Sequence, residues 1–118
     1  MSISAAILGA SGYSGQETLD RVLSHPELEL VALGSDSLAG APARALDPRL
    51  GLVEGVELPA FVVNEDALAA GADLVFCCLE HERAAALEPP AGAVVVDLSG
   101  AHRLTDASLY PAWYGFEH

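Results

Sequence analysis

The chain has 118 residues, of which 52% are hydrophobic, and a formal net charge of −12 at pH 7. This length and composition fit one domain with a sizeable core and argue against an intrinsically disordered chain. With 17 acidic residues against five arginines, the surface would repel nucleic acid and anionic membranes, so we expect neither as a partner.

A glycine-rich segment near the N-terminus joins two predicted elements. Residues 1–8 are predicted to form a buried strand, because the apolar run at its end is continuous rather than alternating. Residues 13–24 have the amphipathic pattern of a helix, which the dipeptide His25-Pro26 ends. The glycines between the two have the spacing G-x-x-G-x-x-G, a variant of the fingerprint of dinucleotide-binding folds.

Each glycine in this turn would serve a pyrophosphate ligand in a different way. Gly9 would let the chain turn off the strand, Gly12 would let the backbone approach the ligand, and Gly15 would let the helix pack closely on the sheet. The free N–H groups of the helix N-terminus would then face the pyrophosphate. The alternative interpretation is a strand–helix turn without a ligand. The candidate pyrophosphate-binding residues are Gly9, Ser11, Gly12, Tyr13, Ser14 and Gly15.

Hydroxyl side chains follow the second predicted strand, residues 28–33, which would lie parallel to the first. In NAD-specific folds an acid near this strand end bonds the ribose 2′-hydroxyl, but here Asp36 comes one step later. Ser35 and Ser37, with Arg44 downstream, therefore favour a 2′-phosphate, as in NADP. A turn cluster held by its own hydrogen bonds explains the same residues equally well.

The middle of the chain is predicted to be less regular. Residues 38–59 are expected to form a long loop that is functional or mobile, with a short helical turn at 43–45. A minor strand over 59–63 and a short helix over 64–70 are expected to follow, with Asn64 as the N-cap of that helix.

A second segment, residues 72–79, is apolar without interruption from residue 74 onward and predicts a central strand covered on both faces. Its carboxyl end would border the ligand crevice, which makes His81 a candidate contact, although an exposed loop histidine is the more common case. A short helix over 82–87 and a further strand over 93–97 are predicted next.

The two cysteines, Cys77 and Cys78, are adjacent in this apolar segment, where neighbouring side chains point to opposite faces. We therefore expect buried thiols, as is usual in a reducing cytoplasm, and neither a disulfide nor a metal site. The sequence has no apolar run of ~20 residues and no basic-then-apolar N-terminus, so we expect a cytoplasmic protein. The aromatic cluster of Tyr110, Trp113 and Tyr114 is more typical of packing than of stacking on bases.

Six short motifs, each present once, are distributed along nearly the whole chain. They are G-A-S-G-Y-S-G at 9–15, H-P-E at 25–27, D-L-V-F at 73–76 with His81, V-V-D-L-S at 95–99, R-L-T-D at 103–106 and W-Y-G-F-E-H at 113–118. Together they resemble the N-acetyl-γ-glutamyl-phosphate reductases, within the larger group related to aspartate-semialdehyde dehydrogenase. The first motif alone is shared with semialdehyde dehydrogenases, whereas the late motifs are far more specific to the reductase.

The resemblance implies NADPH-dependent reduction of an acyl phosphate to a semialdehyde in arginine biosynthesis, through a thioester on a catalytic cysteine. It also implies that Leu79, His81 and Ser99 line the crevice near the nicotinamide. Two motifs depart from the family pattern: S-A-D-F-R-L is S-G-A-H-R-L at 99–104, and P-H-G is E-H-E at 80–82, where an acid would repel a nearby phosphate. Because the family's nucleophile lies beyond the W-Y-G motif, we expect no catalytic residue here and no activity of this chain alone.

The expected fold is α/β, a Rossmann-like doubly wound parallel sheet of at least four strands, forming an NAD(P)-binding domain over residues 1–118 without the catalytic domain. The expected ligands are NADP(H) and, in the full-length family, an acyl phosphate. Two alternatives remain: a fragment related to aspartate-semialdehyde dehydrogenase, and a non-catalytic nucleotide-binding or interaction module. A sheet flank left without cover would favour self-association.

Overall fold

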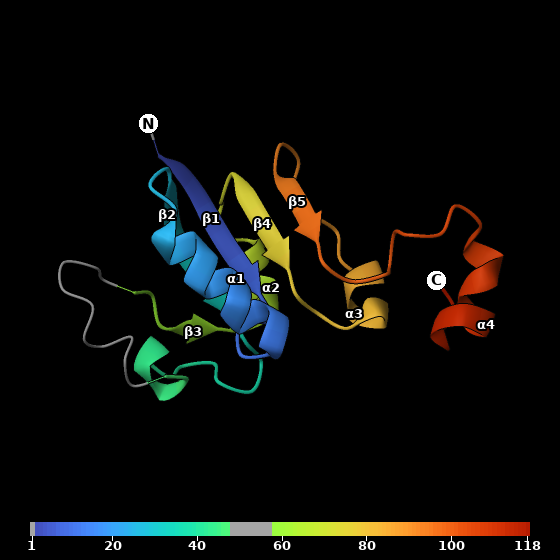
Figure 1. Ribbon diagram of the computed structural model, residues 1–118, viewed down its shortest axis with the longest axis horizontal. Coiled ribbons are helices and arrows are strands. Elements are labelled where there is room, and N and C mark those ends of the chain that lie inside the picture. Colours follow the sequence, from blue (N-terminus) through green and yellow to red (C-terminus); the bar gives the residue numbers. More distant parts are fainter. Residues whose placement is uncertain (1, 48–57) are drawn as a thin grey trace.

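The computed structural model describes residues 2–47 and 58–118. In chain order the elements are β1 (Ile3–Leu8), α1 (Tyr13–Ser24), β2 (Leu28–Gly34), the 3-10 turn η1 (Ala43–Ala45), β3 (Phe61–Val62), α2 (Asn64–Leu68), β4 (Leu74–Cys77), α3 (His81–Ala85), β5 (Val94–Asp97), the 3-10 turn η3 (Ala107–Leu109) and α4 (Tyr110–Tyr114). Five parallel strands form one sheet in the order β3-β2-β1-β4-β5 (Figure 1). The predicted α/β, Rossmann-like fold is confirmed.

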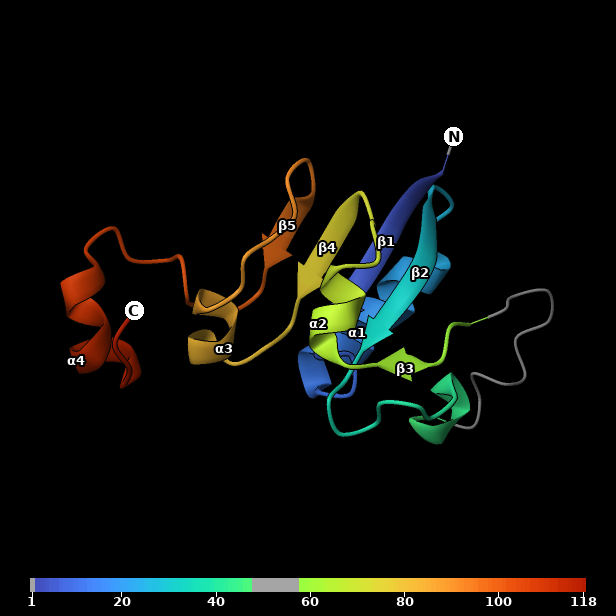
Figure 2. The same ribbon diagram turned by 180° about the vertical axis from the view of Figure 1, so that it is seen from behind.

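The central strand β1 is covered on both of its faces. Ala5 and Ile7 pack with Leu19 of α1, and the alternate residues Ala6 and Leu8 pack with the helix α2 on the other side. Figures 1 and 2 show these two helices on opposite faces of the sheet. The covered part of the strand, residues 5–8, needs apolar side chains toward both faces, which explains the continuous apolar run there.

The order of the strands places a topological switch point beside β1. The chain proceeds from β1 to β2 and β3 on one side, then returns to place β4 and β5 on the other. Ligands of open α/β sheets bind at such a point, outside the carboxyl ends of the strands. The glycine turn after β1 lies at that end of the sheet (Figure 2).

Several predicted boundaries differ from the structure. The N-cap of α2 is Val63 and not Asn64, so the predicted role of Asn64 is wrong, and its side chain bonds elsewhere. The helix predicted over 82–87 begins one residue earlier, at His81. The turn at 43–45 is confirmed, whereas residues 48–57 of the predicted long loop lie outside the described residues.

The outer strand β5 has one exposed apolar face. Val94 is 61% exposed and Val96 38%, and Leu98, two residues further on, is 48% exposed. The side chain between the two valines, Val95, instead packs toward α2 and α3. α1 covers the middle of the sheet, and α4 lies beyond α3, away from the strands (Figures 1 and 2). This apolar flank of β5 is therefore without cover among the described elements.

The C-terminal aromatic cluster is only partly a packing unit. Tyr110 is buried, and its single O–H hydrogen is shared between the carbonyls of Ala101 (2.6 Å) and Gly100 (2.9 Å), while its oxygen accepts from the N–H of Leu104 (3.1 Å). Trp113 is 75% exposed, so the prediction of a packing role is confirmed for Tyr110 and wrong for Trp113. In the part of the chain that is described, no helix has the length and apolar character needed to cross a bilayer.

Candidate functional site

The turn between β1 and α1 brings three backbone segments into contact. Gly9 has a φ of +69°, and a Cβ there would lie 2.5 Å from the carbonyl oxygen of Cys78. A Cβ on Gly15 would lie 2.1 Å from the carbonyl oxygen of Gly9. Both positions therefore require glycine for the fold itself: Gly9 for its positive φ and its close approach to Cys78, and Gly15 for its close approach to Gly9 alone.

Gly12 differs from the other two glycines of the motif. A Cβ there would meet only the Gly9 carbonyl oxygen, at an ordinary 3.6 Å, and its φ of −78° suits any residue. Gly12 is also exposed and caps the helix α1, whose N-terminus has no side-chain cap among the described residues. The space beside Gly12 is therefore free for a ligand, and the first N–H groups of α1 are free to bind an anion there.

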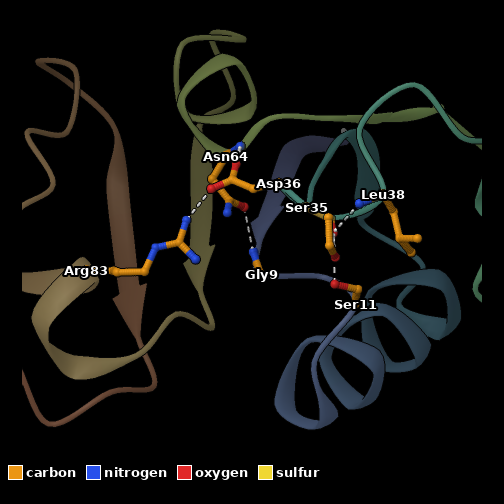
Figure 3. A network of polar contacts seen from close by, with 8 residues as sticks. Gly9, Ser11, Ser35, Asp36, Leu38, Asn64 and Arg83 are labelled. Carbon is orange, nitrogen blue, oxygen red and sulfur yellow. Dashed lines mark hydrogen bonds and ion pairs between the residues drawn. The ribbon is translucent and has the colours of Figure 1, made fainter.

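Three serine hydroxyls connect this turn to the end of β2. The Ser35 hydroxyl lies 2.8 Å from that of Ser11 and accepts a hydrogen bond from the N–H of Leu38 at 3.2 Å (Figure 3). It also lies 3.2 Å from the hydroxyl of Ser37. Ser35 is buried, whereas Ser37 is exposed. Ser35 thus holds the turn, as the turn-cluster interpretation proposed, and the accessible hydroxyl is that of Ser37.

A small cavity opens where the segments after β1, β2 and β4 meet. Its volume is about 290 Å3, and its lining residues are Gly9, Ser11, Gly12, Ser35, Asp36, Ser37, Asn64, Cys78, Leu79, Glu80 and Arg83. Six of the predicted site residues are in this lining: Gly9, Ser11, Gly12, Ser35, Ser37 and Leu79. The other six are outside it: Tyr13, Ser14, Gly15, Arg44, His81 and Ser99. Tyr13 and Ser14 still lie close by, at the first positions of α1.

Asn64 is a site residue that the sequence interpretation missed. Its side-chain oxygen accepts the N–H of Gly9 at 2.8 Å, and its own N–H donates to Asp36 Oδ1 at 2.9 Å (Figure 3). Asn64 is 5% exposed, and it lies so close to β2 that a Cβ on Gly34 would be 2.5 Å from its Oδ1. Asn64 therefore fixes the glycine turn to the ends of β2 and β3. The available signal in the sequence was an amide side chain shortly after a predicted strand end, at the edge of the sheet where the glycine turn was also expected.

Asp36 is engaged by two partners from other elements. Its Oδ1 accepts the N–H of Asn64, and its Oδ2 forms an ion pair with the Arg83 guanidinium of α3 (Figure 3). The backbone N–H of Asn64, assisted by the charge of Arg83, lowers the pKa of Asp36. Asp36 is thus an ionised carboxylate whose two oxygens are both used within the protein.

His81 and Ser99 form hydrogen bonds with the backbone of the loop that follows β5. His81 Nδ1 accepts the N–H of Gly100 at 2.6 Å, and the ring packs edge-on against Tyr114 with centroids 4.8 Å apart. The Ser99 hydroxyl accepts the N–H of Ala101 at 3.1 Å. Their predicted contact with a nicotinamide stays a prediction, as does the contact of the exposed Arg44 with a phosphate.

The two thiols differ in access. Cys77 is buried in β4, as predicted. Cys78 lies one residue beyond β4 and lines the small cavity, so the prediction that it sits in the strand interior is wrong. Burial raises the pKa of both thiols, and the Cys78 sulfur is 3.5 Å from the Thr18 hydroxyl, with no base beside it in the hydrogen bonds of the described residues. Neither thiol has the environment of a nucleophile.

Comparisons with known proteins agree with this geometry. The family described as "Semialdehyde dehydrogenase, NAD binding domain" matches residues 4–115. The N-acetyl-γ-glutamyl-phosphate reductase of Jannaschia sp. (strain CCS1) is 43% identical over 96% of this chain and 33% of its own length. The enzyme of the same name from Paracoccus denitrificans (strain Pd 1222) is 39% identical over 100% of this chain and 34% of its own. The chain thus spans about a third of these relatives.

A solved structure gives the same picture of the fold. The aspartate semialdehyde dehydrogenase of Candida albicans, crystallised with NADP, superimposes with a TM-score of 0.66 and 25% identity. The superposition covers 91% of this chain and 32% of that enzyme. The resemblance drawn from the sequence motifs is confirmed by these comparisons.

Proposed function

This chain belongs to the family of semialdehyde dehydrogenase NAD-binding domains, and on that premise we propose that it is the cofactor-binding part of an NADPH-dependent N-acetyl-γ-glutamyl-phosphate reductase. The observation that carries the proposal is the open space beside Gly12 at the N-terminus of α1, next to the hydroxyls at the end of β2. We call the turn of residues 9–15 around this space the cradle. The reductase relatives, at 39–43% identity, favour this enzyme over aspartate-semialdehyde dehydrogenase, for which the solved structure is 25% identical.

The residues of the cradle fit a dinucleotide. The place beside Gly12, which a Cβ would fill, is open, and the uncapped N–H groups at Tyr13 and Ser14 would bind the pyrophosphate oxygens. Because the net charge of the chain is −12, the phosphates are repelled at long range, and their binding depends on these local donors. When bound, NADPH supplies a hydride for the reduction.

The choice of NADP over NAD follows from the end of β2. The Ser37 hydroxyl is accessible there, and the nearby carboxylate of Asp36 is already bonded to Asn64 and Arg83. A free carboxylate would bond the ribose 2′-hydroxyl and repel a 2′-phosphate, whereas this arrangement does neither.

Titration calorimetry of the 118-residue chain with NADP and NAD tests the cofactor. We expect tighter binding of NADP. Ser37→Asp should reverse the preference by placing a free carboxylate near the 2′-position, and Ser2→Asp, at the opposite end of β1, is the control for the added charge. Binding of neither nucleotide would refute the proposed function, and equal or tighter binding of NAD would refute the cofactor choice.

The complete reaction needs groups that neither cysteine of this chain supplies. Reduction of an acyl phosphate through a thioester requires an accessible thiolate beside a base, and both thiols here are shifted toward the neutral form. We therefore expect no acyl-phosphate-dependent oxidation of NADPH by the 118-residue chain. Turnover above background that Cys78→Ser abolishes would overturn this expectation.

The proposed state in the cell is a cytoplasmic protein that associates through the flank of β5. That flank continues into an apolar cavity of about 560 Å3 beside α1, lined in part by Phe76 and Leu98. Sedimentation should show association that Val96→Ser weakens. Val31→Ser is a matched control, because Val31 is 39% exposed and Val96 38%. A compact monomer of the unmodified chain at all concentrations would contradict self-association.

A further inference from the structure

We propose that Arg83 is the cation that selects the 2′-phosphate of NADP, a role that rests on the proposed function and that the structure assigns to α3, in addition to the Ser37 hydroxyl after β2. Arg83 lies in the sequence far from the β2 end, 47 positions after Asp36, and only the fold brings the two together. The proposal changes which cation is expected to matter, since the sequence pointed to Arg44.

The first argument is the charge of the cavity. Among the described residues that line the small cavity, Arg83 is the only cationic one, whereas Asp36 and Glu80 are both acidic. Arg83 also lines the adjoining larger cavity of about 810 Å3. Without a cation, the two carboxylates in the lining would repel a phosphate dianion, so selective binding of NADP requires Arg83.

The second argument is the geometry of the guanidinium. In the described part of the chain its one hydrogen-bond partner is Asp36, which uses a single nitrogen, Nη2. A guanidinium carries five N–H donors in a planar fork that fits phosphate, so most of its donors stay available. Figure 3 shows Arg83 reaching toward Asp36 from one side of Gly9, with Ser11 and Ser35 on the other side. A phosphate between these walls would meet both a cation and hydroxyls.

The third argument is the role of Asp36. Its second oxygen is held by the N–H of Asn64, which in turn bonds Gly9, so the carboxylate is fixed relative to the glycine turn. Asp36 therefore acts as a positioning residue that aims Arg83 across the cavity. The pair is about half exposed, with side-chain exposures of 48% and 50%. Exposed pairs are weak, so the guanidinium can share its donors with an incoming phosphate at little cost.

Calorimetric titration of the 118-residue chain with NADP and NAD tests the assignment. Arg83→Ala should weaken NADP binding by about 10- to 100-fold, the usual effect of losing a charge-assisted phosphate contact, and should leave NAD binding roughly unchanged or improved. Arg83→Lys should restore part of the NADP affinity, because it keeps the charge without the fork. Arg21→Ala, on the exposed face of α1, is the control for the loss of one positive charge.

A double variant separates the lost cation from the freed acid. In Arg83→Ala the carboxylate of Asp36 loses a partner, whereas Arg83→Ala combined with Asp36→Asn removes the charge of both. If the double variant, like Arg83→Ala, still lacks the preference for NADP, the result supports direct contact of Arg83 with the phosphate. Recovery of the full NADP preference in the double variant would overturn it, since repulsion by Asp36 would then be the whole effect.

The outcomes also separate this inference from the proposed function. If the unmodified chain prefers NADP and Arg44→Ala, but not Arg83→Ala, removes that preference, the inference fails and the proposed function stands. If the unmodified chain binds neither nucleotide, both fail.

Discussion

Replacing Gly15 by alanine, and comparing the result with Gly12→Ala, tests whether one glycine of the turn is needed for stability and the other for ligand binding. The new Cβ would lie 2.1 Å from the Gly9 carbonyl oxygen, and 2.7 and 2.9 Å from the Cα and carbonyl carbon of Ala10. All three are backbone atoms, so no side-chain rotation relieves the contacts, and α1 must move away from β1.

The expected loss of stability in Gly15→Ala is the balance of two opposing effects, helix propensity and overpacking. Alanine gains about 1 kcal/mol of helix propensity over glycine inside a helix. Overpacking costs about 1–3 kcal/mol where side chains can adjust, and more where backbone must shift. We therefore expect Gly15→Ala to lower the free energy of unfolding by about 2 kcal/mol or more, which corresponds to a drop in Tm of roughly 6–10 °C for a domain of this size.

Gly12→Ala is the matched substitution in the same turn. Its Cβ would have a nearest contact of 3.6 Å, and its φ of −78° is unstrained, so the free energy of unfolding should change by less than about 1 kcal/mol. The methyl group would instead occupy the open space beside the N-terminus of α1. NADP binding should therefore weaken by about tenfold or more.

Thermal unfolding followed by circular dichroism and calorimetric titration with NADP measure the two effects. A Gly15→Ala chain with an unchanged Tm would show that the close approach of α1 to the turn is not required. A Gly12→Ala chain that binds NADP as tightly as the unmodified chain would show that the ligand does not lie against this part of the backbone.

Three further predictions concern the groups around the turn. Asn64→Ala should lower the free energy of unfolding by about 1–3 kcal/mol in urea titrations, because the N–H of Gly9 loses its acceptor, and an unchanged midpoint would count against this role. The pKa of Asp36 is lowered by the fold, so its contribution to stability is present above the unfolded value near 4 and is lost as the pH falls through the folded value. Asp36→Asn should therefore make the acid dependence of Tm shallower below about pH 4, and parallel curves would refute the linkage. Burial raises the pKa of Cys77 and Cys78, so iodoacetamide at pH 7 should modify both slowly, Cys77 the more slowly, whereas rates like that of free cysteine would contradict the burial.

The first half of the fold could be predicted from the sequence because its signals are local. The helix over 13–24 was predicted with the bounds it has in the structure, since its periodicity and the following proline are both contained in one segment. The chain reversal at Gly9 likewise follows from the glycine spacing. The bounds of short elements were predicted less well, because a five-residue helix such as α2 contains too few residues to show a periodic pattern.

The polar part of the candidate site could not be predicted in the same way. Asp36, Asn64 and Arg83 come from three different elements, and they meet because β1 lies between β2 and β4 in the sheet. The sequence shows which residues end each strand, but not which ends are neighbours. For the same reason Arg44, close in sequence to the β2 end, was chosen over the more distant Arg83.

The central position of β1 has a consequence for the order of events during synthesis. β1 is made before the other strands of the sheet, yet it pairs on one side with β2 and on the other with β4, where its last residue, Leu8, is opposite Cys77. Parallel neighbours cannot close as hairpins, so both pairings join distant segments. Until the residues up to Cys77 have been added, the apolar segment Ala5–Leu8 lacks its partner β4, and this open edge can pair with other chains.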